Sequence, residues 1–109
     1  MTFGQAITHY RRERKMTQRE LASKVLKEDG EPISPQYLND IERDRRNTPS
    51  EHLIKQFATA LKVAPEVLYV YAKKFPEEFA RIVESADEKS VINACAAFRR
   101  ELRNDAVAA

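Results

Sequence analysis

Cysteine, glycine and tryptophan are scarce in this chain: its 109 residues include one cysteine, two glycines and no tryptophan. A single cysteine, Cys95, excludes an internal disulfide and a metal site built from several cysteines. We expect Cys95 to be a small buried apolar residue on a helix rather than a reactive thiol. His9 and His52 have no second ligand residue at helical spacing, so neither predicts metal binding or catalysis.

Other signatures are absent as well. The sequence contains no nucleophile–base pair and no glycine-rich phosphate loop, so we expect neither an enzyme nor a bound cofactor. No apolar run approaches the roughly 18 residues that span a bilayer, and the N-terminus lacks the apolar segment of a signal peptide. These absences predict a cytoplasmic protein without a membrane-spanning segment.

What the chain does contain favours helices. Glycine and proline are few, runs of alternating β-branched residues are few, and 42% of the residues are hydrophobic, which predicts an all-α fold. A length of 109 residues suits one domain with a short appendage. We therefore expect one small helical core and no second independent one.

The net charge is only +2, but it is unevenly distributed. Residues 1–49 hold ten Lys/Arg against eight Asp/Glu, whereas residues 50–109 hold nine of each. The excess lies in two clusters: Arg11, Arg12, Arg14, Lys15 and Arg19, then Arg43, Arg45 and Arg46. A basic cluster is as often a solvated face as a binding surface, so charge alone leaves a nucleic-acid partner open.

Apolar spacing and capping residues predict the helices of the first two thirds of the chain. A capping box, Thr17 to Glu20, starts a helix at Gln18 that we expect to end between Leu26 and Asp29. A second capping box, Thr48 to Glu51, places Pro49 at the first position of another helix. The predicted helices therefore cover residues 2–14, 18 to about 26, 35–43, 49–62 and 65–71.

The helix after Ser34 carries the most functional information. Ser34 is a candidate N-cap, Pro35 fits the first turn, and only Leu38 and Ile41 are firmly apolar. The other faces carry donors and acceptors that suit the reading of a polar edge: Gln36, Asn39, Asp40 and Arg43. Two helices joined by a turn, with the second polar on one side, form the arrangement that enters the DNA major groove.

Three segments then identify a family. Thr17-Gln18-Arg19-Glu20-Leu21-Ala22, Ile33-Ser34-Pro35-Gln36-Tyr37-Leu38-Asn39-Asp40-Ile41-Glu42-Arg43 and Thr48-Pro49-Ser50 closely resemble the Xre family of helix–turn–helix regulators, also called Cro/cI or lambda-repressor-like. The resemblance covers about Phe3 to Tyr71. It implies a five-helix lambda-repressor-like DNA-binding domain, here expected over residues 1–72, with a two-helix extension over residues 73–109.

The resemblance also implies roles for matched residues. Those implied to lie in or beside the major groove of double-stranded DNA are Ser34, Gln36, Tyr37, Asn39 and Asp40. Those implied to contact phosphates are Gln18, Arg19, Arg43, Arg45, Arg46 and Asn47, with Gln18 also bracing Gln36. Arg11 and Glu42 match a buried salt bridge of the family; the alternative is two unrelated surface charges. Chemically, Gln36 and Asn39 suit the N6/N7 edge of adenine, and Asp40 can accept from cytosine N4.

The chain departs from the family at four places. Lys15 stands where the family usually has glycine, so we expect a differently built first turn. The connection from Leu26 to Ile33 is eight residues rather than about three, which leaves the orientation of the reading helix open. Pro35 cannot donate a backbone hydrogen bond to phosphate, and Asp40 brings a negative charge to the groove.

The last third carries a separate apolar pattern. Helices are predicted from Pro76 and from about Asp87, and the second carries a heptad-like seam: Val91, Cys95, Phe98 and Leu102. One such domain contacts only half a site, so a homodimer formed through this seam is expected, with a repressor as the preferred function. The seam can instead pack on the five-helix core or bind another protein, and an interaction module without DNA binding is the alternative function.

Overall fold

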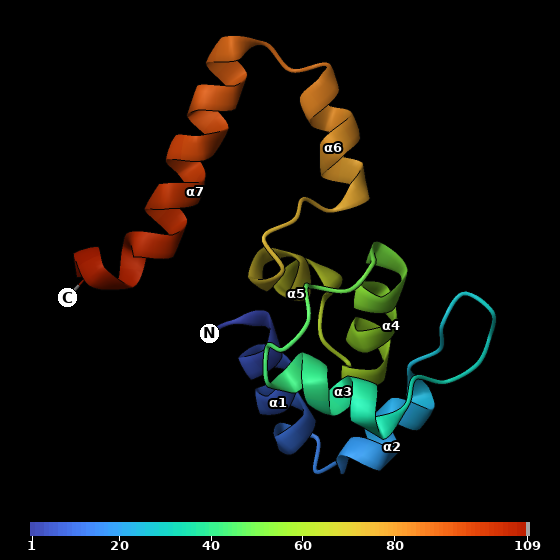
Figure 1. The fold of residues 1–109 in the computed structure, drawn as a ribbon. Coiled ribbons are helices and arrows are strands. Elements are labelled where there is room, and N and C mark those ends of the chain that lie inside the picture. The colour runs from blue at the N-terminus through green and yellow to red at the C-terminus, as the bar shows by residue number, and fades with distance from the viewer. Residues whose placement is uncertain (109) are drawn as a thin grey trace. The chain divides into compact units, whose positions relative to one another are not determined.

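The computed structural model describes the backbone of residues 1–108 and the side chains of residues 1–103. Within that range it contains seven helices and no strand (Figure 1). The helices are α1 (Phe3–Glu13), α2 (Gln18–Lys24), α3 (Pro35–Glu42), α4 (Glu51–Leu61), α5 (Pro65–Tyr71), α6 (Glu77–Glu84) and α7 (Glu88–Ala108). The predicted all-α, lambda-repressor-like class is confirmed.

The chain divides into two compact units, Met1–Pro76 and Glu77–Ala109. The first unit extends beyond residue 72 because the next residues bond back to it. Lys74 donates through its backbone N–H to Tyr69 O at 3.0 Å and through Nζ to Pro49 O at 3.2 Å. Residues 73–76 therefore belong to the first unit, although α5 itself ends at Tyr71.

Local capping sets where the helices of the first unit begin. Thr17 and Glu20 form the predicted capping box, with Glu20 N–H donating to Thr17 Oγ1 at 3.0 Å. Ser34 accepts from Tyr37 N–H at 3.0 Å and caps α3. The predicted start of α4 is wrong: the helix begins at Glu51 with Ser50 as its cap. Pro49 is buried ahead of that cap instead of occupying the first helical turn.

The connection between α2 and α3 is a short hairpin. Helix α2 ends at Lys24, earlier than predicted, because Val25 becomes extended and its carbonyl accepts from Ile33 N–H at 2.9 Å. Leu26 and Pro32 form an antiparallel bridge. Leu26 is in turn held by α4, through Gln56 Oε1 at 3.1 Å and His52 Nε2 at 2.9 Å. Val25 and Ile33 are both buried, so the loop leaves and re-enters the core at fixed points.

The turn between α1 and α2 has a conformation that suits glycine. Lys15 has φ 56°, in the left-handed region, and the turn closes with Met16 N–H donating to Arg11 O at 3.1 Å. Lys15 therefore adopts the left-handed conformation that glycine accommodates most readily. Asp44 also lies in the left-handed region, with φ 57°, where α3 was predicted to stop.

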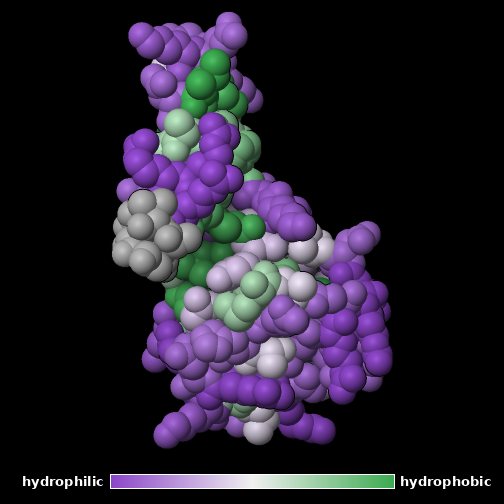
Figure 2. All heavy atoms as spheres, turned by 90° about the vertical axis from the view of Figure 1, so that its left-hand side faces the viewer, coloured by the Kyte–Doolittle hydropathy of each residue, from purple (hydrophilic) through white to green (hydrophobic). Residues whose placement is uncertain are grey.

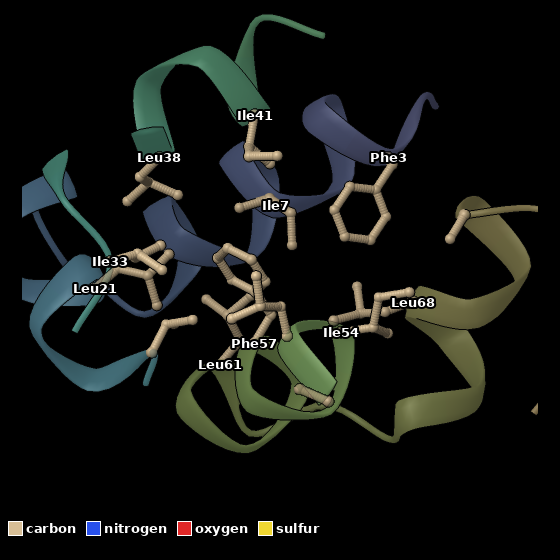
Figure 3. Close-up of a cluster of buried hydrophobic side chains, with 14 of the residues drawn as sticks. Phe3, Ile7, Leu21, Ile33, Leu38, Ile41, Ile54, Phe57, Leu61 and Leu68 are labelled. Carbon is tan, nitrogen blue, oxygen red and sulfur yellow. The ribbon is translucent and has the colours of Figure 1, made fainter. Parts of the chain in front are cut away.

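One apolar core joins the five helices of the first unit (Figure 3). Helix α3 contributes Leu38 and Ile41, the two residues predicted to anchor it, and both are at most 2% exposed. Phe3 and Phe57 meet edge to face with ring centroids 6.3 Å apart. Each large apolar side chain buried in this way contributes roughly 1.5–3 kcal/mol to stability, so α3 depends on the other helices for its structure.

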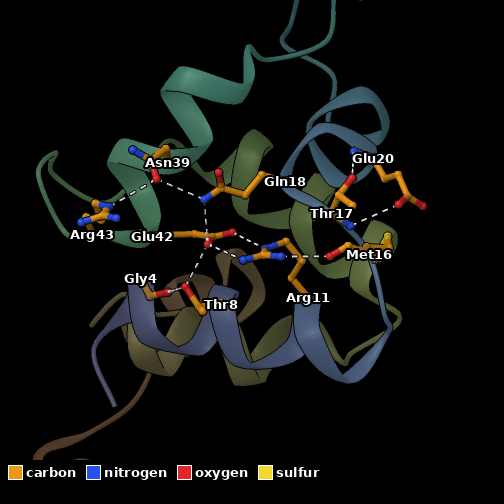
Figure 4. A network of polar contacts seen from close by, with 10 residues as sticks. All are labelled: Gly4, Thr8, Arg11, Met16, Thr17, Gln18, Glu20, Asn39, Glu42 and Arg43. Atoms are coloured by element: carbon orange, nitrogen blue, oxygen red, sulfur yellow. Dashed lines mark hydrogen bonds and ion pairs between the residues drawn. The ribbon is translucent and has the colours of Figure 1, made fainter.

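A buried carboxylate ties α1, α2 and α3 together (Figure 4). The side chain of Glu42, on α3, is only 5% exposed and lies 2.7 Å from Arg11 Nε. Its Oε1 also accepts from Arg11 Nη2 at 3.0 Å, from Thr8 Oγ1 at 3.1 Å and from Gln18 Nε2 at 3.1 Å. Donors from two helices therefore hold one end of α3 against α1 and α2.

A close approach at Gly4 fixes the same junction. A Cβ on this residue would lie 2.7 Å from Glu42 O, which is closer than real Cβ contacts. Gly4 N–H donates to Asp44 Oδ1 at 3.0 Å, and Thr2 Oγ1 lies 2.6 Å from Asp44 Oδ2. The start of α1 and the end of α3 are thus held together by backbone packing as well as by charge.

The second unit consists of α6 and α7. Asp87 Oδ1 accepts from Ser90 N–H at 2.7 Å, and this bond, with a second from the Ser90 side chain, lowers the pKa of Asp87. Cys95 is exposed, so the expectation that it is buried is wrong. Figure 2 shows apolar residues, in green, reaching the surface of these helices. Among the side chains that the structure describes, the large exposed apolar ones of α6 and α7 are Phe79, Ile82, Val83, Val91, Ile92, Phe98 and Leu102.

Neither a membrane-spanning helix nor a metal-binding cluster is found among the described residues. No helix there has the length and apolarity needed to cross a membrane. No group of three His, Cys, Asp or Glu side chains is arranged to hold a metal ion in that part of the chain.

Removal of the buried carboxylate should destabilise the first unit strongly. Glu42→Ala leaves the Arg11 guanidinium buried without its partner, and breaking such a pair lowers the free energy of unfolding by about 3–5 kcal/mol. Urea unfolding followed by circular dichroism measures the change. The matched control is Glu13→Ala, which removes a pair with His9 whose side chains are half exposed; its loss should stay below about 1 kcal/mol. Equal small losses in both variants would contradict a structural role for Glu42.

Candidate nucleic-acid interface

Helix α3 carries a polar face next to its buried edge. Ser34, Pro35 and Gln36 are exposed at its N-terminal end, and Tyr37, Asn39 and Asp40 are partly exposed along it. Arg43, Arg45, Arg46 and Asn47 follow on the exposed segment after the helix. The structure therefore brings the predicted reading residues and three of the predicted phosphate-contacting arginines to one stretch of surface.

Gln18 connects the start of α2 to this face. Its Nε2 donates to Asn39 Oδ1 at 3.2 Å and to Glu42 Oε1 at 3.1 Å. The resemblance had implied that Gln18 braces Gln36. In the structure Gln18 braces Asn39 instead. The same Asn39 oxygen accepts from Arg43 Nε at 3.3 Å, so an uninterrupted chain of hydrogen bonds runs from Arg11 to Arg43 (Figure 4).

Asp40 is partly neutralised by its neighbours. Gln36 Nε2 donates to its Oδ1 at 3.1 Å, and Arg46 Nε lies 3.4 Å from its Oδ2. Arg45 Nη1 is 3.9 Å from Oδ1. The Arg46 guanidinium also stacks over the Tyr37 ring, 4.9 Å from its centroid. The negative charge on the polar face of α3 thus has two cations beside it, both on side chains that remain more than half exposed.

The first basic cluster does not form one binding surface. Arg11 is used inside the polar network around Glu42. Arg14 donates through Nε to Leu61 O at 2.8 Å and through Nη2 to Lys62 O at 3.3 Å, so it caps the end of α4. Arg12, Lys15 and Arg19 are exposed. Sequence clustering alone could not separate these structural arginines from exposed ones.

Thr8 is a residue of the site that the sequence prediction missed. Its Oγ1 lies 3.1 Å from Glu42 Oε1 and 3.0 Å from Gly4 O. The available signal was its position three residues before Arg11 on α1, which places both side chains on one helical face. A hydroxyl at that spacing can reach the same carboxylate as Arg11, that of Glu42.

Comparison with known proteins gives a consistent picture. A family model described as helix-turn-helix matches residues 7–68. The immunity repressor protein of Bacillus phage phi105 is 36% identical over 102 residues, which cover 94% of this chain and 65% of the repressor. This chain thus corresponds to about two thirds of that protein.

A solved structure has the same fold. A chain of the SinR protein/SinI protein complex superposes with a TM-score of 0.54 at 23% identity, over 92% of this chain and 97% of that one. At this identity the likeness shows the fold alone. Because the family model covers more than half of the sequence, the chain belongs to the helix-turn-helix family, as its resemblance to the Xre group predicted.

Proposed function

We propose that this protein is a DNA-binding transcriptional repressor that inserts α3 into the major groove of an operator. The observation that carries the proposal is the division of α3 into a buried edge and a polar face. Leu38 and Ile41 are fixed in the core, and Glu42 is held by two other helices. A rigid presenter of this kind is what base reading requires. Similarity to a phage immunity repressor supports the same function.

In the proposed complex the exposed residues divide by task. The base edges fall to Gln36, Tyr37, Asn39 and Asp40, which lie on the solvent-accessible side of α3, and to Ser34, which caps the helix. The phosphate contacts fall to Gln18 and Arg19 at the start of α2, and to Arg43, Arg45, Arg46 and Asn47 after α3. Gln18 lies at a helix N-terminus, where backbone N–H groups attract phosphate. A regulator of this kind acts where bacterial or phage DNA lies, in the cytoplasm.

We further propose that two copies pair through the tail and read a pseudo-palindromic operator. One domain reaches one half-site, and a pair reaches two half-sites about one helical turn apart. The seam side chains Val91, Cys95, Phe98 and Leu102 are exposed in a single chain. Apolar side chains repeating at this spacing along a helix suit pairing with a second helix.

Charge removal after α3 tests the DNA contact. The double variant Arg45→Ala/Arg46→Ala removes two cations beside the reading face, so its affinity for duplexes selected from a random pool should fall. The plot of log K against log salt has a negative slope, and its magnitude should fall by about 2. Each phosphate that is no longer neutralised accounts for about 1 of this change. Fluorescence anisotropy over a series of salt concentrations measures both quantities.

A matched control separates this contact from a general charge effect. Arg81→Ala/Arg100→Ala removes the same charge from exposed positions in the tail, on the helix faces opposite the apolar side chains. It should retain the wild-type affinity and slope. An absence of wild-type binding to any duplex, or binding that ignores salt, would contradict the proposal and leave the interaction module as the function.

A charge in the seam tests the pairing. Phe98→Glu places a carboxylate at the centre of the apolar seam, and burial of that charge should weaken self-association at least tenfold. Analytical ultracentrifugation of the full-length protein measures the dissociation constant. Asn93→Glu, on the opposite face of α7, should leave it unchanged. A wild-type protein that stays monomeric at high micromolar concentration would contradict homodimerisation.

A further inference from the structure

The Asn39 side chain accepts two hydrogen bonds through its amide oxygen. Gln18 Nε2 donates to Asn39 Oδ1 at 3.2 Å and to Glu42 Oε1 at 3.1 Å. Arg43 Nε donates to the same Asn39 oxygen at 3.3 Å. Asn39 therefore meets two donors on one side of its amide, one from α2 and one from the residue that ends α3.

The chemistry of the partners forces this direction. A guanidinium carries donors only, so the Asn39 atom that faces Arg43 must be the oxygen. Glu42 is paired with Arg11 and accepts only, so Gln18 must turn its NH2 group toward Glu42. The same NH2 group then meets Asn39 as a donor. Rotating either amide by 180° would oppose donor to donor or acceptor to acceptor at two contacts.

The consequence is that Asn39 has no acceptor left for DNA. A carbonyl oxygen has two lone pairs, and Gln18 and Arg43 occupy both. A bidentate contact with adenine needs an acceptor for N6–H and a donor for N7. Asn39 can offer only the donor, its NH2 group. On this argument Asn39 lacks the acceptor that the predicted adenine contact requires.

Resting on the proposed DNA-binding function, we propose that Asn39 is a specificity residue that selects a keto base, guanine or thymine, at one position of each half-site. In the major groove guanine presents O6 and N7 and thymine presents O4, all acceptors for an NH2 group. Adenine and cytosine place amino donors where guanine O6 and thymine O4 lie, so an NH2 group aimed at that position disfavours both bases; N7 is shared by adenine and guanine and does not distinguish them.

Gln36 provides an internal contrast. Its Nε2 donates one hydrogen to Asp40 at 3.1 Å, which leaves the second hydrogen and the amide oxygen. Those two groups are the pair that adenine requires. Neighbouring amides on one helix therefore differ in what they read, because only Asn39 is held by donors on its oxygen.

The experiment is selection of duplexes from a random pool by full-length wild type and by Asn39→Ala. We expect one position of the selected half-site to lose its base preference in the variant, and that position to be guanine or thymine in the wild-type motif. Substituting adenine there should weaken wild-type binding about tenfold and Asn39→Ala binding less than twofold, as expected when a single base-specific hydrogen bond is removed.

A second variant tests the cause. Gln18→Ala/Arg43→Ala removes both donors from the Asn39 oxygen, so the amide can rotate and pair with adenine. Selection at reduced salt, which compensates for the weaker hold on the phosphates, should then show adenine accepted within about twofold of the keto base. Thermal unfolding by circular dichroism identifies a variant that does not fold, and the wild-type and Asn39→Ala comparison decides the matter by itself.

The outcomes separate this inference from the function on which it rests. Adenine or cytosine as the wild-type preference at the position sensitive to Asn39→Ala would overturn the keto selection while leaving DNA binding intact. An Asn39→Ala motif identical to wild type would overturn the role of Asn39. Failure of the wild type to enrich any sequence would overturn the proposed function, and the inference with it.

Discussion

The buried charge of Glu42 is the constraint on which the geometry of this domain depends. A carboxylate that is only 5% exposed must find several donors or it destabilises the fold. Its donors come from Arg11 and Thr8 on α1 and from Gln18 on α2. Satisfying one charge therefore fixes α3 relative to both helices that precede it. The hydrogen-bond direction on the exposed face follows from the same charge, because Gln18 shares one NH2 group between Glu42 and Asn39.

Apolar packing also fixes the position of α3. The connection between α2 and α3 is long, yet Val25 and Ile33 at its two ends are both buried and joined by a backbone hydrogen bond. Between them the chain extends outward as a hairpin held by His52 and Gln56 of α4. Loop length and helix orientation are thus uncoupled. Additional residues in such a hairpin change what projects beside α3 without changing where α3 lies.

The sequence predicted the parts of this fold that local chemistry determines. The Thr17–Glu20 capping box, the Ser34 cap and the apolar pair Leu38 and Ile41 each depend on residues within one or two turns, and each is present in the structure. The contact between Arg11 and Glu42 was implied by family resemblance only, since their separation of 31 residues leaves no local signal.

The sequence predictions were wrong where contacts between segments distant in the sequence determine the structure. Helix α2 ends early because Val25 pairs with Ile33, a contact that helical spacing does not show. The reading proposed for Asn39 departs from the sequence prediction because of a contact of this kind, with Gln18 of α2. A side-chain amide has both donor and acceptor in isolation, and its remaining capacity depends on Gln18 and Arg43. Residue type and helical position identify a reading residue, but the bonds it already makes decide what it can read.

In the proposed complex, Asp40 gives this nearly neutral protein a means of discriminating among DNA sequences. Its contacts with Arg45 and Arg46 are long and solvent-exposed on the arginine side, and pairs of this kind contribute at most about 1 kcal/mol. In the proposed complex phosphates take both arginines with little loss, because counterion release favours the exchange. Asp40 is then left without its cations next to the bases. A cytosine amino group satisfies it, whereas a keto oxygen repels it. On the proposed function, the acidic residue would thus weaken binding to sequences without the matching base, and the small net charge would limit binding to DNA in general.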